Sequence, residues 1–120
     1  MSGEAQSPVR EIREVNGVVS VHLAGDLWGY DATRFLLEAV HELEAKGARR
    51  VVVDLEGLMR VDSAGLGAIA SAFVSLTRAS GRLVLAAAPP KVHDLLSTTM
   101  LLQVIPLYPD VDAARRALGS

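Results

Sequence analysis

The chain contains no cysteine and few aromatic residues. The lack of cysteine excludes disulfides, thiolate metal ligands and a cysteine nucleophile. Phe, Trp and Tyr make up 4% of the 120 residues, which leaves little for stacking on the bases of single-stranded nucleic acid. Lys and Arg number 12 against 14 Asp and Glu, a net charge of −2, so no basic surface for nucleic acid is expected.

Long apolar runs are also missing. No stretch approaches the roughly 18 apolar residues of a membrane-spanning helix, and residues 1–8 lack the basic start and apolar run of a signal peptide. We therefore expect a cytoplasmic protein with no direct membrane insertion. Because 50% of the residues are hydrophobic and 22% are charged, the chain is typical of a folded protein. Its length predicts a single domain over 9–118, after a flexible tail over 1–8.

The first two expected elements form a hairpin. Residues 9–15 and 18–24 read as strands on either side of Asn16-Gly17, the strongest short hairpin signal. The first of these strands is charged and thinly apolar, which is typical of a sheet edge. Residues 25–30 are expected to form a loop.

Beyond the hairpin, helices and strands alternate. Four stretches with apolar residues at helical spacing begin near Asp31, Ser63, Pro90 and Asp110. Short apolar runs predict strands over 51–55, 83–88 and 104–107, with a loop over 56–61. The order β-β-α-β-α-β-α-β-α indicates an α/β fold with a mostly parallel sheet, an antiparallel N-terminal edge strand and packed helices.

The segment 62–67, with the sequence DSAGLG, stands out on physical grounds. It lies between a buried strand and a helix, at the carboxyl end of the sheet, where open α/β sheets place their sites. Gly65 and Gly67 are poor helix formers in the first turn, which indicates that something approaches the backbone closely. Asp62 or Ser63 could simply cap the helix. Alternatively, Ser63 could carry a phosphate, whose charge the start of a helix tolerates.

The whole pattern resembles a STAS domain, the fold of bacterial anti-sigma factor antagonists. The resemblance covers roughly 9–118 and rests on GDL at 25–27, VVDL at 52–55, DSAGLG at 62–67, LVLA at 83–86 and IPLY at 105–108. It implies that Ser63 is phosphorylated by a partner that is both a serine kinase and an anti-sigma factor. The unphosphorylated protein would bind that partner and release a sigma factor to permit transcription, and a serine phosphatase would reset the switch.

The resemblance also implies a partner-binding surface around Ser63. Its candidate residues are Asp26, Trp28, Tyr30, Leu58, Met59, Asp62, Ser63, Ala64, Gly65, Leu66 and Gly67. Trp28 stands where the family often has a second acidic residue, so it is either a partner anchor or a cover over the first helix. Leu58 and Met59 are either exposed contacts or a cover over the end of the sheet. Residues 97–100 replace a Gly-Leu pair that the family often has after its third helix.

No enzyme is expected. An esterase elbow around Ser63 needs a glycine where this chain has Val61. Three scattered histidines lack the spacing of metal ligands, so we predict neither a metal nor a cofactor. A receiver-like aspartyl phosphate could be imagined on Asp54, but we expect Asp54 to accept backbone hydrogen bonds in the loop that leads to Ser63.

Other functions of the same fold remain open at this point. The alternatives are a scaffold in a stress-signalling complex and an accessory subunit of a lipid ABC transporter. No coiled coil or long exposed apolar stripe demands a dimer, so we expect a monomer or weak dimer.

Overall fold

The computed structural model describes residues 7–119, so most of the expected tail, residues 1–6, lies outside the described residues. The strands are β1 (Val9–Val15), β2 (Val18–Leu27), β3 (Arg50–Val61), β4 (Arg82–Ala86) and β5 (Leu107–Tyr108). The helices are α1 (Gly29–Ala45), α2 (Ser63–Arg78), α3 (Pro90–Thr98), the short 3-10 helix η1 (Leu101–Gln103) and α4 (Val111–Gly119).

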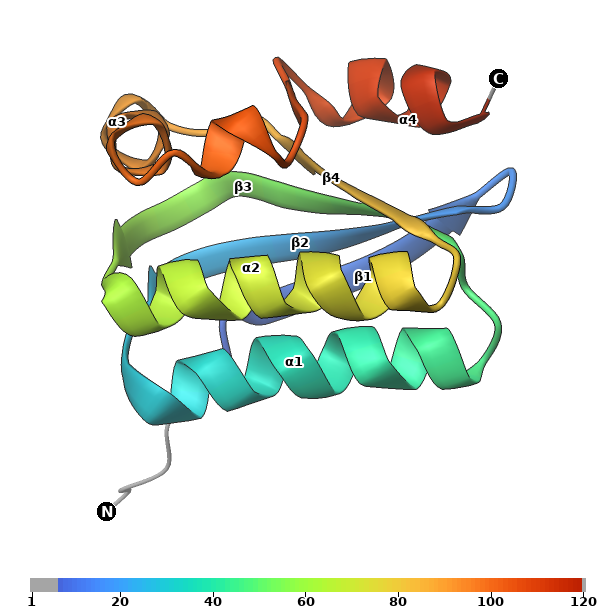
Figure 1. Cartoon of the computed structure of the whole chain (residues 1–120), viewed down its shortest axis with the longest axis horizontal. Coiled ribbons are helices and arrows are strands. Elements are labelled where there is room, and N and C mark those ends of the chain that lie inside the picture. The colour runs from blue at the N-terminus through green and yellow to red at the C-terminus, as the bar shows by residue number, and fades with distance from the viewer. Residues whose placement is uncertain (1–6, 120) are drawn as a thin grey trace.

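The five strands form one sheet in the order β1-β2-β3-β4-β5. β1 pairs antiparallel with β2, and the other neighbours are parallel. α1 and α2 run side by side across one face of the sheet, and α3 and α4 lie on the opposite side (Figure 1). This arrangement confirms the expected α/β fold with an antiparallel edge strand.

β3 is the centre of the core because residues 51–55 are buried on both faces of the sheet. Val51 and Val53 belong to the apolar cluster that includes Leu36 of α1 and Ile69 of α2. Their neighbour Val52 belongs to a second cluster, with Ala114 and Leu118 of α4. The continuous apolar run therefore reflects a central strand covered by helices on both sides.

The expected hairpin is confirmed. Asn16 and Gly17 both have positive φ, at 54° and 80°, which suits the two central residues of a type I′ turn. Val15 pairs with Val18 across this turn. The expected cap of the last helix is also present, because Ala113 N donates to Asp110 Oδ1 at 2.7 Å.

Two expected loops are wrong, because β2 and β3 continue through them. Asp26 pairs with Arg60, and Leu27 pairs with Val61. β2 therefore extends to Leu27, and β3 extends to Val61, two residues before Ser63. The register shifts twice in this stretch. Such bulges break the strict two-residue alternation of apolar and polar side chains, so the pattern alone did not indicate strands there.

Other boundaries differ at the carboxyl ends of elements. β4 stops at Ala86 because Ala87 takes a positive φ of 59°. The last strand is Leu107–Tyr108 instead of 104–107, since η1 folds the preceding segment into a helical turn and leaves Val104 61% exposed. Among residues 7–119, no helix is both long and apolar enough to cross a membrane.

Candidate functional site

Asp62 joins the start of α2 to the turn between β2 and α1. Its Oδ1 accepts a hydrogen bond from Gly65 N at 2.8 Å, which is the usual bond of a helix cap. Its Oδ2 accepts from Gly29 N at 2.9 Å. One carboxylate therefore holds the first turns of α1 and α2 together. The expected cap of α1, Asp31, instead lies within the first turn of that helix.

Ser63 is the first residue of α2, and its side chain is exposed. Within residues 7–119, no hydrogen-bond partner holds its hydroxyl. Asp62 caps α2, so Ser63 does not serve as the helix cap. The positive end of the α2 dipole lies beside the hydroxyl. Ser63 is thus accessible and sits where added negative charge is tolerated.

The two glycines of the segment have different roles. A Cβ on Gly65 would lie 2.2 Å from Leu27 O, a backbone atom that cannot swing aside. A Cβ on Gly67 would meet nothing within 4 Å. Gly65 therefore permits α2 to pack closely on the end of β2, whereas Gly67 is exposed and leaves the outer surface of the first turn bare.

Beside this turn, Arg60 is held by two side chains. Its Nε and Nη2 donate to Asp26 at 3.2 and 2.8 Å, and its guanidinium lies 5.2 Å from the centre of the Trp28 ring. The hydrogen bond from Arg60 lowers the pKa of Asp26 below its ordinary value. Where the family often has a second acidic residue, this chain thus has Trp28, whose ring stacks on the Arg60 guanidinium.

Large exposed hydrophobic side chains surround this ion pair. Trp28, Tyr30 and Met59 are 52, 78 and 75% exposed. All three line a surface hollow of about 480 Å³ together with Asp26 and Arg10. Trp28 is therefore no simple cover over the first helix, and Met59 is an exposed side chain.

The remaining candidates of the segment divide by burial. Leu58 and Leu66 are 4 and 9% exposed and belong to the core cluster, so Leu58 covers the end of the sheet. Gly65 is buried as well, and Ala64 is exposed next to Ser63. We name the Ser63 surface the half-buried Asp26 together with the exposed residues Trp28, Tyr30, Met59, Ser63, Ala64 and Gly67.

A polar row on the α4 side of the sheet was missed. Asp54 Oδ2 lies 2.6 Å from His22 Nδ1, and His22 Nε2 lies 2.9 Å from Ser20 Oγ. Asp54 also accepts from Glu56 N at 3.0 Å, the kind of backbone bond expected for it. Ser20 is fully buried and accepts a hydrogen bond from Arg115 of α4, so its hydroxyl is closed to a substrate. The pairing of His22 with Asp54 across β2 and β3 is the signal that could have located this row.

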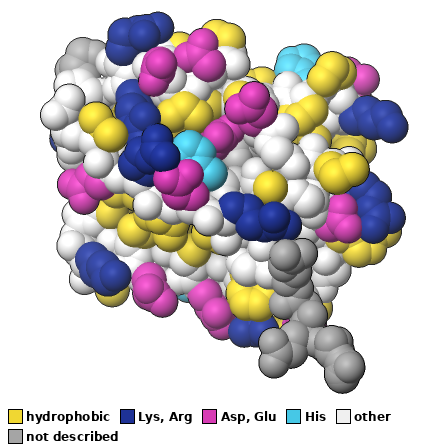
Figure 2. Space-filling view, turned by 180° about the vertical axis from the view of Figure 1, so that it is seen from behind, with side chains coloured by type: hydrophobic (Ala, Val, Ile, Leu, Met, Phe, Trp, Pro, Cys, Tyr) yellow, Lys and Arg dark blue, Asp and Glu magenta, His cyan; other side chains and the backbone are white. Residues whose placement is uncertain are grey.

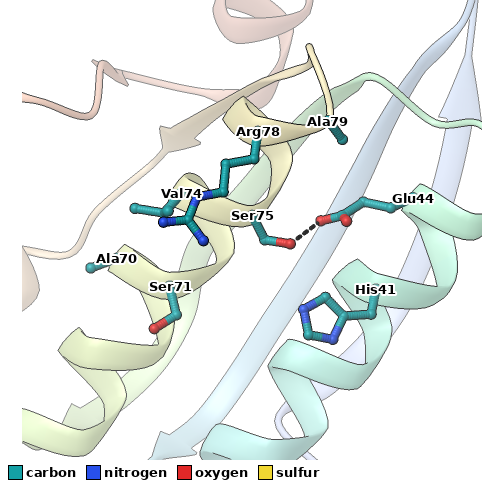
Figure 3. Close-up of a pocket in the computed structure, with 8 residues that line it drawn as sticks. All are labelled: His41, Glu44, Ala70, Ser71, Val74, Ser75, Arg78 and Ala79. Carbon is teal, nitrogen blue, oxygen red and sulfur yellow. Dashed lines mark hydrogen bonds between the residues drawn. The ribbon is translucent and has the colours of Figure 1, made fainter.

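An open groove lies between the outer faces of α1 and α2 (Figure 3). Ser75 of α2 donates to Glu44 of α1 at 2.7 Å within it. None of the residues that the sequence singled out lines this groove. Across residues 7–119, no three His, Asp or Glu side chains are grouped so that they could hold a metal ion.

Known proteins share this sequence pattern and fold. The family model of the STAS domain matches residues 10–114. The anti-sigma F factor antagonist of Paenibacillus polymyxa is 26% identical over 98 residues, which cover 82% of this chain and 84% of that protein.

Two solved structures share the fold. An anti-sigma factor antagonist from Mycobacterium paratuberculosis is 24% identical, with a TM-score of 0.81 over 92% of each chain. The anti-sigma factor antagonist SpoIIAA in its unphosphorylated form is 20% identical, with a TM-score of 0.75 over 92% of this chain and 96% of that chain. Because the family model matches most of this chain, the chain belongs to the STAS domain family.

Proposed function

We propose that the protein is an anti-sigma factor antagonist controlled by phosphorylation of Ser63. The unphosphorylated form binds an anti-sigma factor that is also a serine kinase, and so frees a sigma factor in the cytoplasm. Phosphorylation of Ser63 ends this binding, and a serine phosphatase restores it. The observation that carries the proposal is the free, exposed hydroxyl of Ser63 beside an aspartate that already caps the helix.

The position of Ser63 explains how a phosphate would act. A phosphate adds about −1.5 to −2 charges and three acceptor oxygens at the start of α2. The helix dipole and the backbone N–H groups of the first turn accommodate that charge within the protein itself. A partner packed against Ala64 and Gly67 would have to desolvate it or face it with its own acidic groups. The modification therefore acts on the interface instead of the fold.

The hydrophobic part of the Ser63 surface supplies anchors for the partner. Trp28 and Tyr30 flank Gly29, which donates a hydrogen bond to Asp62, and both line one hollow with Met59. Such side chains are typical hot spots of protein interfaces when they enter a pocket of the partner. The similarity to anti-sigma factor antagonists supports the assignment of this partner class.

The first test is to map the modification. The protein is incubated with the candidate kinase and ATP, and its peptides are analysed by mass spectrometry. We expect one phosphate, on Ser63, and none in the Ser63→Ala variant. Ser71→Ala, which removes another exposed serine of the same helix, is the matched control and should leave incorporation unchanged. Phosphate on another residue, or co-purification with a transporter ATPase or a large scaffold in place of a kinase, would overturn the proposal.

A further inference from the structure

Among residues 7–119, no strand pairs with the outer edge of β1. β1 is the terminal strand of the sheet, and all of its residues after Val9 are exposed. Ile12 and Val15 are 46 and 40% exposed. Seen from behind, basic and acidic side chains are interspersed on the surface of the molecule (Figure 2). A free edge presents backbone N–H and C=O groups that can pair with another strand.

The hairpin determines which backbone groups of β1 point outward. Val15 and Val18 flank a two-residue turn, so they form a hydrogen-bonded pair, and such pairs then alternate along the strand. Arg13 accordingly directs its carbonyl toward β2, where Ser20 Oγ donates to it at 3.3 Å. The N–H and C=O groups of Ile12 and Glu14 therefore point away from β2 and are free for a partner strand.

The order of side chains in β1 is complementary to itself. Its sequence is Val-Arg-Glu-Ile-Arg-Glu-Val. If two copies lie antiparallel with Ile12 opposite Ile12, Arg13 faces Glu11 of the other copy and Arg10 faces Glu14. Every charged side chain of β1 then faces an opposite charge, and such cross-strand pairs are stabilising. The Arg13–Glu11 pairs lie on the regular part of the strand, whereas Arg10 lies at a β-bulge. Ile12 carries outward backbone groups, so this central pair is also a hydrogen-bonded one.

Two-fold registers centred on a charged residue are unfavourable. A shift that centres the pairing on Glu11 or Glu14 places two carboxylates opposite each other, and one centred on Arg10 or Arg13 places two guanidinium groups opposite each other. Like charges directly opposite are destabilising. Charges on an edge usually discourage pairing, but this order of charges favours the Ile12-centred register over every register centred on a charged residue.

We propose that two copies of this chain associate through β1, antiparallel and centred on Ile12, into one continuous two-fold sheet. β1 is regular from Glu11 to Val15, so the central pairs form on an undistorted strand. In the single chain Arg13 already pairs with Glu11 of its own strand, and dimerisation exchanges this contact for the cross-strand one. The two-fold axis places the two Ser63 surfaces at opposite ends of the sheet, so both stay accessible.

The interface is narrow and its ion pairs are exposed, so the dimer is weak. An interface made by one short edge strand is expected to bury less than the about 1,200 Å² of a standard interface, as weak and transient complexes do. Salt screens exposed ion pairs, so association should weaken as ionic strength rises. This proposal does not depend on the phosphorylation of Ser63.

Sedimentation velocity over a range of protein concentrations tests the proposal. The wild-type protein should shift from the mass of one 12.7 kDa chain to that of two as its concentration rises at low salt. The acidic variant Arg10→Glu/Arg13→Glu and the basic variant Glu11→Arg/Glu14→Arg should each stay monomeric, with association at least about tenfold weaker. An equimolar mixture of the two should dimerise, because each strand now complements the other.

Two controls make the result specific. Glu42→Arg reverses an exposed charge on α1, away from β1, and should leave dimerisation unchanged. Ile12→Pro removes an outward N–H and should abolish dimerisation, with circular dichroism confirming the fold of each variant. A wild-type protein that stays monomeric at every concentration would overturn the proposal. The proposal would also be overturned if either charge variant dimerised alone, or if a mixture of the two folded variants stayed monomeric.

Discussion

At the scale of single residues, the site depends on how closely α2 approaches the end of β2. Gly65 allows this approach because it has no side chain to meet Leu27 O. Gly67 lies in the same turn without any such neighbour. The two glycines look alike in the sequence and differ in the space around them, so the same substitution should have opposite effects.

We expect Gly65→Ala to lower the free energy of unfolding by about 2–4 kcal/mol, because its methyl group would force backbone atoms apart. Gly67→Ala should raise it by about 0.5–1 kcal/mol, because alanine is the better helix former and has open space there. Urea denaturation followed by circular dichroism measures both values. Equal effects of the two substitutions would contradict the packing described for this turn.

Asp62 is the residue on which two helices depend. Asp62→Ala should lower the free energy of unfolding by about 1–2 kcal/mol, because it removes the cap of α2 and leaves Gly29 N without its acceptor. Asp62→Asn keeps one acceptor oxygen and should lose less. Thermal unfolding in a calorimeter gives the comparison, and an alanine variant as stable as the wild type would refute the double role of this carboxylate.

At the scale of elements, local patterns predicted the hairpin, the four main helices and the central strand. They did not predict contacts between residues distant in the chain. The bond from Gly29 to Asp62 and the pair Asp26–Arg60 each join β2 and its turn to the end of β3 across more than thirty residues. Backbone pairing between β2 and β3 extends both strands through the two expected loops, and α1 begins at Gly29. The sequence motif located Ser63, but only the fold shows which neighbours are exposed.

The Asp26–Arg60 pair at the ends of β2 and β3 gives a pH prediction. The carboxyl of Asp26 should titrate below the ordinary value of an aspartate, because Arg60 donates hydrogen bonds to its charged form. The pair therefore persists above the ordinary pKa and is lost as the pH falls through the lowered one, with little effect on stability since it is exposed. An NMR titration measures this. Arg60→Gln should raise the midpoint, whereas Arg34→Gln, which removes a different ion pair, should not.

The turn between β2 and α1 carries Trp28, which we propose as an anchor for the partner. Trp28→Ala should weaken binding of the anti-sigma factor by more than about 1 kcal/mol and leave the fold intact, because the ring is half exposed. Isothermal titration calorimetry measures the affinity. Val104→Ala, which truncates an exposed hydrophobic residue on another segment, is the control. A Trp28→Ala protein that binds as tightly as the control would remove Trp28 from the interface.

At the scale of the whole molecule, the Ser63 surface and the free edge of β1 lie on different parts of the sheet and adjoin at Arg10, which lines the hollow with Trp28 and Met59. The Ser63 surface lies at the carboxyl ends of β2 and β3, whereas the free edge of β1 runs along the side of the sheet. Neither apolar cluster of the core contains a residue of the Ser63 surface, and of β1 only Val9 packs against one of them. Under the proposed function, a charge added at Ser63 is expected to change partner binding without reshaping the rest of the protein.

The most direct test compares the affinity of the anti-sigma factor for the unmodified protein and for the protein stoichiometrically phosphorylated on Ser63, by isothermal titration calorimetry. We predict that phosphorylation weakens binding by more than about tenfold, or about 1.4 kcal/mol, and that Ser63→Ala binds like the unmodified protein before and after treatment with kinase and ATP. Equal affinities of the phosphorylated and unmodified proteins would contradict the account.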